Sequence, residues 1–209
     1  MRRRAAVASV LVASLLAGTR AHAQTTAQCE QRLNDVRKVL DDDARRTRVW
    51  YWAWMGIGSS LFVGQTVLAA VTTGNPQKDF AVGAFASAFV PTILLLHPPL
   101  VLSDANRLRD RLALTTVEGR VGDPCIAVNR AVDLLSRDAD DEALETSWLN
   151  HVFVIGGNIF LGAVLGVGFH DWAGAAKQAI GGTIVGEAQI LTFPGGALKA
   201  RALGLTATW

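Results

Sequence analysis

No charged side chain occurs between Val49 and Gln77, and this stretch limits what the chain can fold into more than any other part of the sequence. Its apolar portion, 50–71, is long enough to cross a hydrocarbon core, for which a helix needs roughly 20 residues. Four of the five residues at 50–54 are aromatic, which is typical of the headgroup zone. Because 50% of the residues are apolar and only 18% are charged, the composition also indicates an integral membrane protein.

A second apolar run, 80–102, predicts a helix that returns across the membrane after a turn at 72–79. Proline lacks a backbone donor and clashes with the preceding helical turn. We therefore expect Pro91 to kink this helix, and Pro98 and Pro99 to distort or end it.

The third and fourth apolar runs predict a second hairpin. Run 148–169 is of spanning length, and its only titratable side chain is His151. After a turn at 170–174, run 177–193 contains Glu187, and a re-entrant or interfacial helix remains an alternative for it.

The order of polar helix, span, turn and span occurs twice, first over 29–99 and then over 125–196. We expect an all-α fold, an integral membrane four-helix bundle of two hairpins, and internal duplication is a hypothesis that this order suggests. At a shift of 98 residues, five aligned positions are identical: Gly58, Phe62, Gly64, Ala81 and Gly83 match Gly156, Phe160, Gly162, Ala179 and Gly181.

Small residues recur at four-residue spacing in each run, which places them on one helix face. Because apolar burial gives helices no reason to associate in lipid, such flat faces are expected to form the helix contacts. They are Gly56, Ser60 and Gly64; Gly83 and Ser87; Gly162 and Gly166; and Gly182 and Gly186.

The N-terminus predicts a signal peptide over 1–23. Arginines at 2–4 precede an apolar run at 5–16, and the small-residue pattern of 21–23 predicts cleavage, with an uncleaved anchor as the alternative. Residue 24 onward is then outside the cytoplasm, which predicts a bacterial inner-membrane protein with its polar helices on the periplasmic side.

The polar segments divide the mature chain. We expect an exported polar helix at 24–48, a first transmembrane hairpin at 49–102 and an exported helical segment at 103–147. A second transmembrane hairpin follows at 148–196, with a C-terminal tail at 197–209. Three arginines at 45–48 lie on the expected outer side, contrary to the usual positive-inside bias.

The two cysteines support the paired arrangement. Cys29 and Cys125 each begin an apolar helical stripe, and they stand 21 and 23 residues before Trp50 and Trp148. As helices, both segments would rise roughly 30 to 35 Å above the membrane, so the thiols would reach the same height. Disulfides form and persist outside the cytoplasm, and the sequence therefore predicts a Cys29–Cys125 bridge. The other stripe residues are Leu33, Val36 and Leu40, and Val128, Val132 and Leu135.

Glu187 is the first candidate for an intramembrane polar site, because an ionisable group at membrane depth is costly and tends to face a partner, a cavity or an ion pathway. Its expected partners are Asn158, Gln65 or His151. A structural hydrogen bond between helices is the simpler interpretation. His97 and His151 could form an axial metal or haem pair, but lone interfacial histidines are commoner, and we expect no cofactor and no metal.

The sequence carries no nucleophile motif and no phosphate-binding loop, so we expect no enzymatic activity. Acidic and basic residues are interleaved, which argues against nucleic-acid binding. The leading hypothesis is a noncatalytic scaffold or accessory subunit of the cell envelope, in contact with the bilayer and with a protein partner or other copies of itself. The alternative is a small oligomeric channel or transporter that uses Glu187.

A further alternative comes from the C-terminal residues 203–209. Apolar and polar residues alternate there and end in an aromatic, as in the last strand of an outer-membrane barrel. The long continuous apolar runs elsewhere argue against a barrel.

Overall fold

The computed structural model describes residues 25–117, 120–121 and 123–206, and the predicted signal peptide at 1–23 lies outside them. The described chain is helical apart from two short antiparallel strands, β1 (Thr116–Val117) and β2 (Arg120–Val121). The predicted all-α class is confirmed. Residues 203–206 form turns, so the strand expected from the C-terminal alternation is not formed in the described part of that segment.

The first hairpin consists of α2 (Thr26–Val71) and α3 (Asn75–Leu96). Helix α2 runs unbroken for 46 residues, so the polar helix and the first span are one rod. The connection turns at Gly74, whose φ of 73° lies in the left-handed region that favours glycine.

The predicted effect of the double proline is confirmed. Helix α3 continues through Pro91 but ends at Leu96, before Pro98 and Pro99. The chain after them starts a separate helix, α4 (Val101–Thr115), so the second run ends six residues earlier than residue 102.

The second half begins with α5 (Pro124–Glu145), which is separated by a short break from α6 (Trp148–Ala163). Helix α6 continues into the π-helical turn η1 (Val164–Gly168), and α7 (Trp172–Leu191) runs back beside it. A last short helix, α8 (Gly196–Ala202), folds against α5 and α2.

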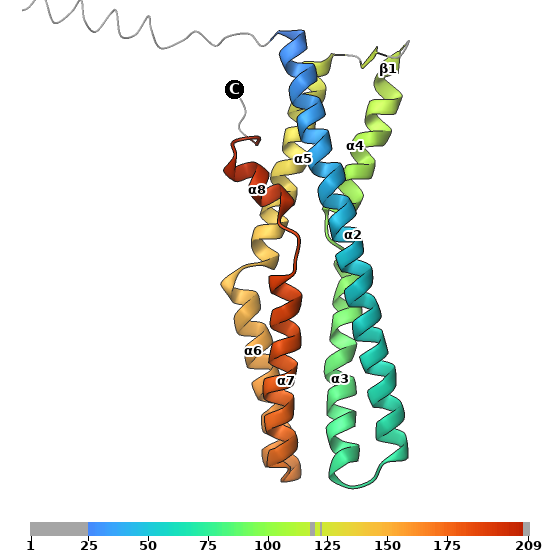
Figure 1. Cartoon of the computed structure of the whole chain (residues 1–209), viewed down its shortest axis with the longest axis vertical. Helices are drawn as coiled ribbons and strands as arrows, with labels where there is room; N and C mark the ends of the chain where they lie inside the picture. Colours follow the sequence, from blue (N-terminus) through green and yellow to red (C-terminus); the bar gives the residue numbers. More distant parts are fainter. Residues whose placement is uncertain (1–24, 118–119, 122, 207–209) are drawn as a thin grey trace, which may run out of the picture.

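The buried core lies at one end of the molecule, which we call the head: residues 26–50 of α2 with α4, α5 and α8 (Figure 1). In the head, α2 and α5 lie side by side in parallel and are covered by α4 and α8. The apolar stripes that begin at the two cysteines supply most of the core. It consists of Cys29, Leu33, Val36, Leu40 and Ala44 from α2; Val101, Ala105, Leu108 and Leu112 from α4; Val128, Ala131, Val132, Leu135 and Ala139 from α5; and Ala197 and Ala200 from α8.

The two hairpins stand side by side below the head, and a compact four-helix bundle is not confirmed (Figure 1). Helix α2 packs along α3 and α6 packs along α7, but contacts between the hairpins are sparse. Near the head, the indole nitrogens of Trp50 and Trp54 donate to the Thr192 hydroxyl at 3.3 and 3.2 Å. The Trp50 ring also packs edge-on against Phe193. The hairpins therefore meet near the head, and they meet again at the turn end, where the Asp79 carboxylate of α3 lies 3.8 Å from the Lys177 ammonium of α7.

Within the described residues, three helical segments are long and apolar enough to cross a membrane: 26–71, 75–110 and 124–168. They indicate a membrane location. Helix α7 is not among them, since Lys177 and Glu187 lower its hydropathy.

The small-residue faces form contacts within the hairpins at most of the predicted positions. A β-carbon added at Gly162 would lie 2.9 Å from the carbonyl oxygen of Ala175, so only glycine allows α6 and α7 to approach this closely. Gly166, Gly182, Gly186 and Gly83 also face the partner helix of their own hairpin.

The first helix departs from that pattern. Gly56 and Gly64 face open space, and it is Gly58 that packs against Val90 and Pro91 of α3. The 98-residue alignment pairs this packed Gly58 with Gly156, which is open. It also pairs open Gly64 with packed Gly162, so the aligned glycines do not have equivalent surroundings.

Candidate functional site

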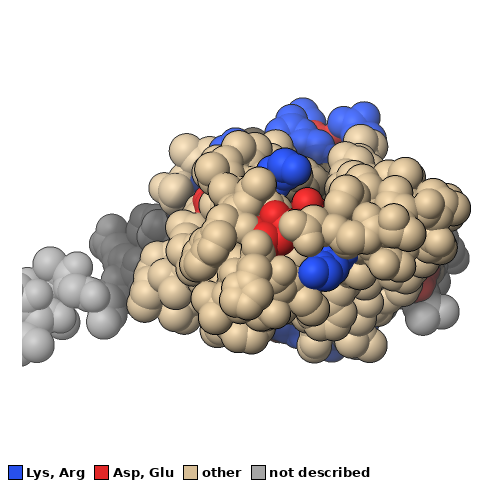
Figure 2. Space-filling model, turned by 90° about the horizontal axis from the view of Figure 1, so that it is seen from below, with Lys and Arg blue, Asp and Glu red and all other residues tan. Residues whose placement is uncertain are grey.

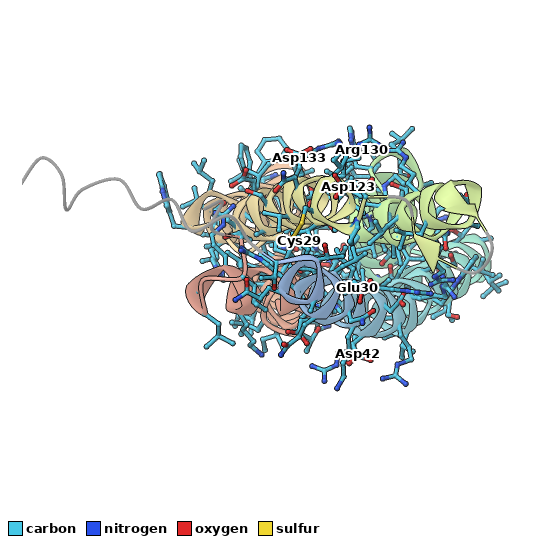
Figure 3. The ribbon with its side chains drawn as sticks, turned by 90° about the horizontal axis from the view of Figure 1, so that it is seen from above. Cys29, Glu30, Asp42, Asp123, Arg130 and Asp133 are labelled. Carbon is cyan, nitrogen blue, oxygen red and sulfur yellow. A yellow bond between two sulfur atoms is a disulfide. The ribbon has the colours of Figure 1, made fainter. Side chains whose placement is uncertain are left out.

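The tip of the head is fixed by the predicted disulfide between Cys29 and Cys125 (Figure 3). The two α-carbons are 5.0 Å apart, and the bridge joins the first turns of α2 and α5. Each helix has a well-formed start. Thr25 and Gln28 form a capping box on α2, and Asp123 caps α5 just before Pro124.

The base of the head contains a group of buried carboxyl groups, which we call the acid cluster: Asp43, Asp104, Asp138 and Glu142. They come from α2, α4 and α5, and each is at most 2% exposed. Burying charge in this way is costly unless the groups are hydrogen-bonded, paired or neutral.

Two members of the acid cluster hold α8 in place. Asp43 accepts hydrogen bonds from the backbone N–H groups of Gly196 at 3.2 Å and Ala197 at 3.1 Å. Glu142 accepts from Ala197 at 3.1 Å and Leu198 at 2.8 Å. The backbone donors at the start of α8 are thus satisfied by one carboxyl from each half of the chain.

The other two members have incomplete hydrogen bonding. Asp104 has an ion pair with Arg107 at 3.0 Å, but its second oxygen has no hydrogen-bond partner among the described residues. Neither oxygen of Asp138 has one within the described chain, and the same holds for the nearby buried position Thr47 on α2.

The buried environment makes two of these groups retain a proton. Burial, together with the negative charges of Asp104 and Asp43, raises the pKa of Asp138 to about 8. Burial and a hydrogen bond with Asp43 raise the pKa of Glu142 to about 8, although the backbone donors of α8 favour its ionised form. Near neutral pH, Asp138 and Glu142 are therefore protonated in a large fraction of molecules.

The acid cluster can hold protons and anchor α8. Within the described residues, no group of three or more histidine, cysteine or acidic side chains has a geometry that could hold a metal ion.

Two of the three residues predicted for an intramembrane polar site are in contact, and their position within a membrane stays a prediction. His151 on α6 and Glu187 on α7 meet with Nδ1 and Oε2 2.6 Å apart, so one of the three expected partners of Glu187 is the observed one. Both side chains are partly buried. The pair joins the two helices near the head end of the second hairpin.

The other two expected partners lie elsewhere. Asn158 accepts a hydrogen bond from Gln178 at 3.1 Å, two helical turns further along α6 from His151. Gln65 accepts from Ser87 at 2.9 Å within the first hairpin. These two hydrogen bonds each join the helices of one hairpin, and buried polar groups tie helices together in lipid in this way.

The histidine pair considered for a metal or haem is not formed. His151 contacts Glu187, whereas His97 is an electrostatic neighbour of Glu145 on α5. Burial raises the pKa of Glu145, the nearby Asp141 raises it further, and His97 partly offsets both.

The acid cluster was not predicted from the sequence, but a signal for it exists. The buried stripe of α2 continues from Leu40 to Asp43 and Thr47 with unchanged three- and four-residue spacing. The stripe of α5 continues from Leu135 to Asp138 and Glu142 in the same way. Acidic residues in the helical phase of a buried stripe therefore mark the cluster.

Comparison of the chain with protein-family models, with curated proteins and with solved structures found no match.

Proposed function

We propose that this chain is a noncatalytic membrane component of the cell envelope, a scaffold or accessory subunit whose head docks a partner protein. The observation that carries the proposal is the location of the core. The continuous buried core of the described residues belongs to the head, whereas the hairpins bury few side chains and expose many large apolar ones. This division matches a rigid docking body on a lipid-embedded anchor.

The head is held at three levels. The Cys29–Cys125 bridge fixes its tip, and the carboxyls of Asp43 and Glu142 fix α8 at its base. At the start of α4, Asp141 accepts a hydrogen bond from the Leu100 backbone at 3.1 Å. A surface that is preorganised in this way loses less entropy when a partner binds.

We infer that α7 is the fourth span, although it is not among the segments that are apolar enough to cross by composition. Its first residue, Trp172, follows the turn at the end of α6, and its last, Leu191, is followed by α8 in the head. Helix α7 therefore covers the same height as α6, so α7 must cross wherever α6 crosses. Four crossings place both ends of the mature chain on one side, which we propose is the periplasmic side of a bacterial inner membrane.

Transport is the second candidate function, and the His151–Glu187 pair favours it. A titratable pair at membrane depth is a recurrent element of proton and ion pathways. The sparse contact between the hairpins argues against an enclosed path in one copy, so a pore would require several copies.

Two measurements test docking against transport, the first on the purified chain and the second in intact cells. In liposomes under an imposed gradient, we expect neither the wild type nor Glu187→Gln to carry ions or protons above protein-free vesicles. In intact cells, a photoreactive residue at exposed Asp35 on the head is expected to give one defined adduct with another protein.

The matched control for docking carries the same photoreactive residue at Phe153 on α6, which is 73% exposed on the apolar surface, and no such adduct is expected there. Flux in the wild type that falls in Glu187→Gln would contradict the docking proposal and support transport. Absence of an adduct from the head in the native envelope would also contradict it.

A further inference from the structure

An open apolar cleft lies between the two hairpins at their turn end. Its volume is about 740 Å³, which is within the range of small-molecule sites, and it is lined from α2, α3, α6 and η1. Ala70, Val82, Phe85 and Leu161 are among its apolar walls, and Gln77 and Lys78 are the only polar residues that line it. The cleft forms where contacts between the two hairpins are sparse.

Lys78 spans the mouth of this cleft. Its ammonium group lies 5.4 Å from the centroid of the Phe169 ring, so a lysine of the first hairpin is held over an aromatic wall of the second. It also donates to Asn75 at 3.4 Å, and no ion pair to a carboxylate is formed within the described part of the chain. Lys78 is the only lysine or arginine between Arg48 and Arg107.

The second lysine at this end serves as a natural comparison. Lys177 lies outside the cleft, is 77% exposed and is 3.8 Å from Asp79. Seen from the turn end, the surface is mostly uncharged, with a few basic side chains around a small acidic area (Figure 2). Among the described residues at this end, Lys78 is thus the cation that lines an apolar cleft and has no carboxylate partner.

We propose that the cleft binds an acyl chain of an anionic phospholipid whose phosphate contacts the Lys78 ammonium. The apolar walls suit a hydrocarbon chain, and a cation at the end of a spanning segment lies at headgroup depth. A phospholipid with net negative charge is favoured over a zwitterionic one because Lys78 adds an unpaired positive charge at the mouth. A helix of a second copy fits less well: with a diameter of about 10 to 12 Å, fewer than about two helical turns would fill the cleft.

Native mass spectrometry of the purified full chain tests this inference, with dioleoyl phosphatidylglycerol and dioleoyl phosphatidylcholine as probes. We expect the wild type to bind phosphatidylglycerol about fivefold more tightly, the effect of one lysine near a phosphate. Lys78→Gln is expected to remove this preference, and Lys78→Arg to keep it. Lys177→Gln is the matched control and should leave the preference unchanged.

A further substitution tests the apolar part of the site. Ala81→Phe places a large ring in the cleft and is expected to lower binding of both lipids. Equal binding of the two lipids by the wild type, or a preference that survives Lys78→Gln, would overturn the inference. A dimer in the spectrum that Ala81→Phe abolishes would assign the cleft to a second copy and would overturn it too.

Discussion

Replacing Cys29 and Cys125 together by serine is expected to lower the free energy of unfolding of the head by about 4 to 5 kcal/mol. The bridge closes a loop with a sequence separation of 96 residues, and the chain-entropy cost that it removes from the unfolded state grows with loop length. Amide hydrogen exchange followed by mass spectrometry in detergent micelles measures the loss, because residues 26–42 of α2 and the amides of α5 report opening of the head.

Two comparisons make this result specific. Reduction of the wild-type bridge should accelerate exchange in the head as much as the double replacement does. Peptides from α6 and α7 should keep their rates, since the hairpins are not connected through the bridge. Unchanged exchange in the head after loss of the disulfide would mean that the packed core alone sets its stability.

The second large effect is a fall in head stability as pH rises from 6 to 9. Asp138 and Glu142 have ordinary pKa values of 3.8 and 4.5, and both are raised to about 8 in the fold. Between those values the folded head holds protons that the unfolded chain has released. The contribution of these two carboxyl groups to the free energy of unfolding is therefore fully present below their ordinary pKa values. It is lost as pH rises through about 8. The charged groups that act on Asp138 are Asp43 from α2, Asp104 from α4, and Asp141 and Arg137 from α5.

The variant Asp138→Asn isolates one of these groups. Asparagine keeps the shape of the protonated side chain but cannot ionise. Between pH 6 and pH 9 the wild type is expected to lose about 2 kcal/mol more than the variant, measured by the same hydrogen-exchange experiment. Asp133→Asn, an exposed change on the same helix, should retain the wild-type pH dependence. Equal pH dependence in wild type and Asp138→Asn would show that Asp138 is ionised throughout.

The features that were predictable from the sequence depend on local pattern and chain length. The long uncharged runs determine the hairpins, Pro98 and Pro99 end α3, and the apolar stripes determine which faces of α2 and α5 are buried. The bridge followed from equal heights of Cys29 and Cys125 above the spans, a length argument that needs no tertiary detail.

What was not predictable depends on contacts between distant segments. Helix α8 has seven residues and little periodic signal, and its position is set by hydrogen bonds to Asp43 and Glu142. The phase of the buried stripes marks the acidic residues on α2 and on α5, but their meeting with Asp104 of α4 depends on how the three helices pack. How few contacts the two hairpins make with each other depends on which helix faces meet. Gly56 and Gly64 are exposed, so a face of small residues need not be a contact between helices of the same chain.

The prediction for Glu187 lies between these cases. Glu187 is predictable as a polar site because an ionisable side chain is costly to place in lipid, and His151 is one of its three predicted partners. Which of these partners contacts Glu187 depends on the register of α7 against α6. That register is set by glycine contacts such as Gly162 with Ala175. Asn158 therefore faces Gln178 instead of Glu187.

The most direct test of a membrane anchor with its head on one side of the membrane is thiol labelling of three variants, each with one added cysteine, in intact cells and inverted membranes. The native cysteines are joined in the bridge, so the added thiol is the only free one. With an impermeant maleimide, Asp133→Cys in the head should react only from outside. Thr73→Cys, in the first hairpin turn, and Ala173→Cys, in the first turn of α7, should react only from the cytoplasmic side. Reaction of either turn position from the side of the head would contradict the four crossings and the one-sided head.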